Sequence, residues 1–341
     1  MSGRGAAPGP GLLAGVDVGG TKVLGVALRP DDPAAVLAEA RVPTPDTETG
    51  LLDAIADVVR QLDGQAGDPV TAVGVGIAGL VDRTGRLRVS PNLPGRRNVD
   101  VGVELDRRLD LPVRVDNDAT CAAWGEHLAG AARGAEDAVL VALGTGIGAG
   151  IIADGELVRG AHGFGGEAGH VVVDPRGPRC PCGRRGCWER FASGSGLGWL
   201  GRQAAEAGQF PRGVELAGGV ADNVRGEHVT QAAREGDDDA LEVMREFAAW
   251  VALGVGNLVT LLDCSLVVIG GGLVEAGEVL LGPVRAAYRH QVMAPEERED
   301  VRIVSAELGE RAGAIGAALL GGRDAAVGAE TPRQYGPPER T

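Results

Sequence analysis

Two stretches of the chain repeat one pattern, in which an apolar segment, a glycine-rich turn and a second apolar segment follow one another. The first is LLAGVDVGGTKVLGVAL at residues 12–28, and the second is DAVLVALGTGIGAGIIADGEL at residues 137–157. A further apolar segment follows each copy, VTAVGVGIAGLVD after the first and CSLVVIGGGLVE after the second. Apolar runs bounded by glycine predict strands. The repeat therefore predicts a duplicated α/β core, and the longer second copy carries an insertion.

The chain has 341 residues, more than one hydrophobic core usually supports, so we expect two lobes. Its formal net charge of −14 disfavours nucleic acid and anionic membranes as partners. No signal peptide and no apolar run of about 18 residues is evident, which indicates a cytoplasmic protein with a small-molecule partner. Thiols stay reduced in that compartment, so three cysteines in CPCGRRGC at residues 180–187 indicate a metal site.

The spacing of apolar residues along the chain predicts two further helices and the order of the expected parts. Apolar residues at helical spacing predict a helix that starts near Thr47 and stops at Gly64, and a long apolar helix over 237–263. The expected parts, listed in chain order, are a flexible N-terminus (1–11), a small α/β lobe (12–119), a large α/β lobe (120–306) with a metal-binding loop (170–190), a helix (307–321) that is a candidate to pack on the small lobe, and a flexible tail (322–341).

Three glycine-rich turns are candidates for phosphate binding, because their backbone N–H groups can approach phosphate oxygens closely. They comprise Asp17, Gly19, Gly20, Thr21 and Lys22, then Gly144, Thr145 and Gly146, and finally Gly270, Gly271 and Gly272. Asp17 could hold Mg²⁺ through water. Each turn alone is more typical of a plain hairpin, whereas three at corresponding strand ends of a duplicated chain predict a nucleotide bound between two lobes.

At this point the sequence resembles a known family. The motifs DVGGTK, PNLPG, NDA, GTGIGAG, GGEAGH and CPCGRRGCWE occur in this order over roughly residues 12–321. The chain is thereby similar to the ROK family of sugar kinases and repressors, and most similar to its bacterial glucokinases. The resemblance implies a two-lobed, actin-like (ribonuclease H-like) ATPase fold, which agrees with the repeat.

The resemblance also implies roles for individual residues. Asp118 of the NDA motif matches the catalytic aspartate, the general base, whereas a bare aspartate at a helix start is more often only an N-cap. The positions that match sugar-binding residues of the family are Asn92, Asn117, Asp118, Glu167, His170 and Glu189. Three positions depart from the common pattern, namely Asp116, Thr120 and Arg96, and two of these, Thr120 and Arg96, are candidates to alter the sugar preference.

The cysteine cluster has the spacing of a structural zinc site. His170, Cys180, Cys182 and Cys187 supply three thiolates and one imidazole, which is a closed tetrahedral ligand set with no open position for water. The zinc would hold a loop whose ends carry Glu167 and Glu189. The alternative is three buried structural thiols, the reading we give to Cys121 and Cys264 in their apolar contexts.

The predicted activity is ATP-dependent phosphorylation of glucose at the 6-hydroxyl, with Mg²⁺ accompanying ATP and with Zn²⁺ as a structural ion. An N-acetylhexosamine kinase of the same family and polyphosphate as the donor stay open as alternatives. A sugar-responsive ROK regulator is less favoured, since only sixteen residues precede Asp17 and a helix-turn-helix domain is expected there. We expect a homo-oligomer, either a dimer or a tetramer.

Overall fold

The computed structural model describes residues 11–90, 93 and 97–326, so Asn92 and Arg96 lie outside the described residues. Its first sheet has five strands in the order β3-β2-β1-β4-β8. These strands are β1 (Leu12–Val18), β2 (Lys22–Arg29), β3 (Asp32–Pro43), β4 (Val70–Ile77) and β8 (Val113–Asn117). β2 pairs antiparallel with both β1 and β3, whereas β4 pairs in parallel with both β1 and β8.

The second sheet repeats the first strand for strand, in the order β11-β10-β9-β12-β13. Its strands are β9 (Ala138–Leu143), β10 (Ile147–Ala153), β11 (Glu156–Leu157), β12 (Leu266–Gly270) and β13 (Arg302–Ser305). The pairings β11–β10 and β10–β9 are antiparallel, while β12 and β13 continue the sheet in parallel. This correspondence confirms the duplicated α/β core with two lobes that the repeat predicts.

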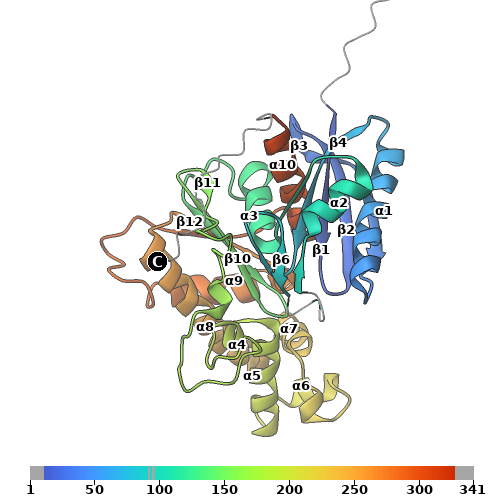
Figure 1. Cartoon of the computed structure of the whole chain (residues 1–341). Helices are drawn as coiled ribbons and strands as arrows, with labels where there is room; N and C mark the ends of the chain where they lie inside the picture. The colour runs from blue at the N-terminus through green and yellow to red at the C-terminus, as the bar shows by residue number, and fades with distance from the viewer. Residues whose placement is uncertain (1–10, 91–92, 94–96, 327–341) are drawn as a thin grey trace, which may run out of the picture.

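Two helices, α3 (Asp118–Ala129) and α10 (Ala312–Ala326), lie between the two sheets (Figure 1). The C-terminal helix α10 packs on the first sheet, where a Cβ at Gly74 would lie only 1.7 Å from the carbonyl oxygen of Ala317. Helix α3 packs on β10 of the second sheet, where a Cβ at Gly150 would lie 2.7 Å from the oxygen of Ala119. Each half of the chain therefore ends in a helix that lies against the sheet of the other half.

The outer face of the first sheet is covered by α1 (Glu48–Ala66), whose N-cap is Thr47. The predicted helix end at Gly64 is wrong, because the helix continues to Ala66 and ends at Gly67. Gly67 has a φ of 81°, the left-handed conformation that a helix end favours, whereas Gly64 stays helical on an exposed turn. A third, three-stranded sheet of β5 (Leu80–Val81), β6 (Leu87–Val89) and β7 (Arg97–Val99) precedes α2 (Val101–Leu109).

The insertion of the second half lies between β11 and β12 and is mostly helical. It comprises η1 (Ala168–His170), α4 (Glu189–Ala192), α5 (Gly194–Glu206), α6 (Pro211–Leu216), η2 (Ala221–Asn223), α7 (Gly226–Glu235) and α8 (Asp238–Leu262). Beyond β12 follow η3 (Gly272–Ala276), α9 (Glu278–Tyr288) and η4 (Gly309–Arg311). Helix α8 is the one described helix that is long and apolar enough to cross a membrane, but half of that stretch is buried within the fold, against α7 and α9. Its apolar residues are thus accounted for by the core.

Candidate active site and metal centre

Asp118 is the first residue of α3 and follows directly on the last residue of β8. The N-cap of this helix is Asn117, whose Oδ1 accepts a hydrogen bond from the backbone N–H of Thr120 at 3.0 Å. The other end of the same amide, Nδ2, donates to the oxygen of Gly79 at 3.1 Å and to Oδ1 of Asp118 at 2.9 Å. The reading of Asp118 as only a cap is therefore wrong, because the residue before it performs that task. Asn117 orients the Asp118 carboxylate instead.

The carboxylates of this region influence one another. Burial raises the pKa of Asp118, and hydrogen bonds from Ala119 and Asn117 oppose that rise. Burial and then the charge of Asp118 raise the pKa of Asp17 to about 7, while Lys22 lowers it. Burial also raises the pKa of Glu167, His170 lowers it, and the charges of Asp118 and Glu189 raise it again. These carboxylates therefore lie close enough to influence one another's charge, and a raised pKa makes an ionised carboxylate a stronger base.

The first glycine turn joins β1 to β2. The N–H of Gly19 donates to the oxygen of Lys22 at 3.0 Å, and the Thr44 hydroxyl donates to the oxygen of Gly19 at 2.8 Å. Lys22 itself forms an ion pair with Glu310, with Nζ 2.5 Å from Oε2. Gly20 and Thr21 are exposed, and the backbone oxygen of Thr21 accepts a hydrogen bond from the N–H of Thr44 at 3.1 Å. A nucleotide contact by Lys22 would compete with its ion pair.

The second and third glycine turns lie together. Gly271, which follows β12, has a φ of 78°, and a Cβ there would lie 2.5 Å from the oxygen of Leu143 at the end of β9. Only glycine fits so close an approach. The carbonyls of the second turn accept hydrogen bonds from the start of α5, Gly144 from the N–H of Gly194 at 2.8 Å and Thr145 from the Ser195 hydroxyl at 2.7 Å.

A groove of about 1250 Å³ opens beside these turns. Gly144, Thr145 and Gly272 line one side, and residues of α4, α5 and α7 line the other, among them Arg190 and Trp199. A large groove with glycine backbone at one end suits a nucleotide, whose phosphates need close approach to N–H groups. Two of the three predicted phosphate turns therefore share one groove. The first turn does not line it and belongs to the other lobe.

The predicted sugar-contacting residues Glu167, His170 and Glu189 gather at one place. Oε2 of Glu167 lies 3.9 Å from Nε2 of His170, and Oε1 of Glu189 lies 3.6 Å from Nδ1 of the same ring. The Glu189 carboxylate also lies beside the second turn, because a Cβ at Gly146 would be 2.6 Å from its Oε2. Acceptors placed in this way can bind adjacent hydroxyl groups.

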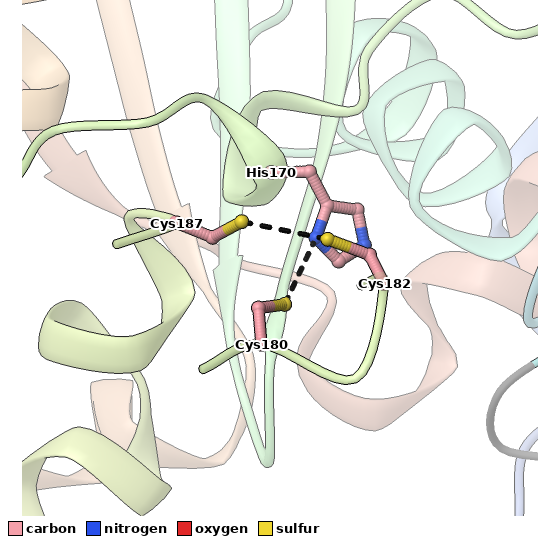
Figure 2. Close-up of side chains that lie close together, drawn as sticks. All are labelled: His170, Cys180, Cys182 and Cys187. Carbon is pink, nitrogen blue, oxygen red and sulfur yellow. Dashed lines mark hydrogen bonds between the residues drawn. The ribbon is translucent and has the colours of Figure 1, made fainter. Parts of the chain in front are cut away.

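The four predicted metal ligands converge as well (Figure 2). The ligand atoms of His170, Cys180, Cys182 and Cys187 all lie within 4.8 Å of one another. Sγ of Cys182 and Sγ of Cys187 are 3.5 Å apart, and Sγ of Cys180 is 3.7 Å from Nδ1 of His170. A tetrahedral zinc ion with Zn–S distances of about 2.3 Å separates its ligand atoms by roughly 3.8 Å. The residues therefore fit a zinc ion, whereas Cys121 and Cys264 are buried in the core as expected.

His170 offers one nitrogen to each of its two predicted roles. Nδ1 faces the thiols, while Nε2 faces Glu167 on the other side of the ring. Sequence reasoning missed the groove arginine Arg190 and the ion pair between Asp116 and Arg159, with Nε 2.8 Å from Oδ2. No short motif marks these residues, because the groove and the ion pair each bring distant segments together. In the sequence, Asp116 stood out only as a departure from the motif that is common in the family it resembles.

A duplicated α/β core with glycine turns that suit phosphate groups and buried carboxylates with raised pKa fits a phosphotransferase, whose catalysis depends on position and charge. The model of the ROK family matches residues 13–323, and the chain belongs to that family. The glucokinase of Streptomyces coelicolor is 38% identical over 91% of this chain and 97% of its own. The glucokinase of Thermotoga maritima is 37% identical, covering 90% and 96%, and the N-acetylmannosamine kinase of Citrobacter koseri is 33% identical, covering 89% and 97%.

Solved structures agree with this assignment. A ROK family glucokinase from Streptomyces griseus, in complex with glucose and AMPPNP, superposes with a TM-score of 0.81 at 38% identity, covering 92% of this chain and all of that one. The ROK hexokinase of Thermus thermophilus gives a TM-score of 0.78 at 33% identity, covering 93% and 100%. The expected family and its two-lobed sugar-kinase fold are thus confirmed.

Proposed function

We propose that this protein is an ATP-dependent glucokinase, which transfers the γ-phosphoryl group of ATP to the 6-hydroxyl of glucose. The observation that carries the proposal is the orientation of Asp118, a carboxylate with a raised pKa that accepts a hydrogen bond from Asn117 and lies near Glu167. The glucokinases at 37% and 38% identity, matched over nearly their whole length, support glucose as the substrate.

In the proposed reaction Asp118 takes the proton from the 6-hydroxyl of glucose, and the oxygen of that hydroxyl attacks the γ-phosphorus. The bond between that phosphorus and the oxygen bridging to the β-phosphate breaks, and ADP leaves. Asn117 holds the carboxylate toward the sugar through the 2.9 Å hydrogen bond from Nδ2 to Oδ1 of Asp118. Phosphoryl transfer demands little covalent work from a protein, so position and charge provide most of the rate.

The donor would lie in the groove beside Gly144, Thr145 and Gly272. The ATP analogue bound by the Streptomyces griseus enzyme supports ATP as the donor and, with it, Mg²⁺. Magnesium neutralises phosphate charge when it is bound, and Asp17 is the residue that would hold it through water. The pKa of about 7 for Asp17 without a cation is in keeping with a carboxylate that gains by binding one.

The sugar would be bound by Asn92, Glu167, Glu189 and Nε2 of His170, while Nδ1 of His170 and the three thiolates bind a structural zinc ion. The zinc ligands alternate along the chain with the sugar ligands, since Glu167 precedes His170 and Glu189 follows Cys187. A zinc ion would thus hold two sugar-contacting carboxylates in place without taking part in the reaction.

A coupled assay with several hexoses and donors tests this function. We expect glucose and ATP to give the highest kcat/KM. A preference for N-acetylmannosamine would favour the alternative that the Citrobacter koseri relative supports. A regulator needs sugar contacts but no general base, so sugar binding without turnover would point to a regulator. The predicted homo-oligomer and cytoplasmic location stay predictions, which sedimentation and cell fractionation can test.

A further inference from the structure

Two neighbouring residues of α4 face different sites. Glu189 reaches the metal ligands, with Oε1 3.0 Å from Sγ of Cys180. Arg190, the next residue, lines the groove that also contains Gly144 and Thr145. The short helix α4 therefore lies between the predicted sugar side and the predicted donor side of the site.

The backbone N–H of Arg190 donates to the oxygen of Cys187 at 2.9 Å, but its side chain forms no hydrogen bond or ion pair with the described part of the chain, and Nε is buried without an acceptor. Three other arginines line the groove, and of these Arg225 is exposed whereas Arg202 and Arg234 have partners. Arg202 donates to the oxygen of Val224 at 2.9 Å, and Arg234 donates to the oxygen of Glu275. Buried polar groups are nearly always paired in folded proteins, so an unpaired guanidinium N–H beside a ligand groove indicates a ligand.

The backbone that carries Arg190 is held firmly. Trp188 is 1% exposed, and its Nε1 donates to the oxygen of Trp250 at 2.8 Å. Phe191 stacks on the Trp250 ring with 4.3 Å between the ring centroids. Just beyond α4, the 2.8 Å hydrogen bond from Gly194 N–H to Gly144 O ties this segment to the second glycine turn. Arg190 is thus fixed in relation to the turn that is predicted to bind phosphate.

We propose that Arg190 binds the phosphate groups of the donor in this groove. The inference rests on the proposed function, because it takes the groove to be the donor site. A guanidinium offers several N–H donors in one plane and pairs with phosphate oxygens in charge-assisted hydrogen bonds. Arg190 would thus add a fixed positive charge to an otherwise glycine-lined end of the groove. It would act on the donor rather than on the sugar.

The test compares Arg190→Ala, Arg190→Lys and the control Arg245→Ala in the zinc-loaded protein. Arg245 is also an arginine, but it lies on an exposed face of α8 and pairs with Glu242, outside the groove. Calorimetry measures the Kd of ATP, ADP and adenosine for each protein with Mg²⁺ present. We expect Arg190→Ala to weaken ATP binding by about ten- to a hundredfold, the range of a charge-assisted hydrogen bond, while adenosine binding changes less than about twofold.

Arg190→Lys should lose less ATP affinity than Arg190→Ala, because lysine keeps the positive charge but not the planar guanidinium. Arg245→Ala should bind ATP as the wild type does. The KM for ATP should rise in parallel, with the KM for glucose unchanged. Unaltered ATP binding in a folded Arg190→Ala protein would overturn the inference, and so would an equal loss for adenosine. A wild type that binds ATP but phosphorylates no hexose would refute the proposed function, while the binding data would still decide the role of Arg190.

Discussion

Nε of Arg159 lies 2.8 Å from Oδ2 of Asp116, and this ion pair joins the two halves of the chain. Asp116 is on β8, two residues before Asp118, while Arg159 begins the segment that leads to Glu167. The two side chains are only 2% and 15% exposed. The pair therefore holds the strand that carries the predicted base against the segment that carries a predicted sugar ligand.

Removal of one partner of this pair should destabilise the protein. We expect Arg159→Ala to lower the free energy of unfolding by about 3 kcal/mol, because a buried carboxylate is left without its partner. The double variant Asp116→Asn with Arg159→Ala should recover part of that loss, since no charge is then left buried. Denaturant unfolding measures both. The exposed pair of Arg289 with Asp300 gives the control, and Arg289→Ala should cost less than about 0.5 kcal/mol. An equal cost for the two arginines would contradict the prediction.

Asp118→Asn should remove most of the rate and leave sugar binding intact. The amide can accept hydrogen bonds but cannot take the proton, so we expect kcat to fall by about 10² to 10⁴. Steady-state kinetics and glucose binding by calorimetry check the two parts. Asp106→Asn, on the exposed face of α2, is the matched control and should behave as the wild type does. A kcat near the wild-type value in Asp118→Asn would leave this residue without a catalytic role.

Asp17 should make the stability of the nucleotide-free protein depend on pH. Burial and the charge of Asp118 raise its pKa from 3.8 to about 7, so the folded state binds a proton more tightly than the unfolded state does. Between about pH 4 and 7 the unfolded state binds fewer protons, and stability falls as pH rises through that window. Asp17→Asn removes this loss, so it should stabilise the protein at pH 8 by on the order of 4 kcal/mol and have little effect at pH 4. Thermal and denaturant unfolding at both pH values measure the difference. A gain of equal size at both would rule out titration of Asp17 as its cause.

Loss of the metal should damage the sugar side more than the donor side. Cys182→Ser removes one of four ligands, so we expect bound zinc to fall from about one per chain and the KM for glucose to rise. The KM for ATP should change much less, because Trp188 and Phe191 anchor α4 in the core independently of the metal. Metal analysis and kinetics on the folded fraction give the answer. A wild type without zinc, or a variant with an unchanged glucose KM, would show that the cluster has another purpose.

The sequence alone determined the duplicated core, because strands and glycine turns leave local patterns that recur in both halves. It also determined the candidate metal ligands, whose spacing between His170 and Cys187 is short enough to read along the chain. The NDA motif pointed to Asp118 through its match to the family that the sequence resembles. In each of these cases the chemistry depends on residues that lie near one another in the chain or at matching places in a repeat.

Tertiary structure alone decided the features whose partners lie far apart in the chain. Arg159 meets Asp116, and Arg190 shares a groove with Gly144. The tertiary structure also showed that Asn117 is the N-cap of α3. If the helix began one residue later, Asp118 would be the N-cap instead. The physical reason is common to all of these features. Charge pairing, close packing and cap geometry depend on distances in space, and only the folded chain sets those distances.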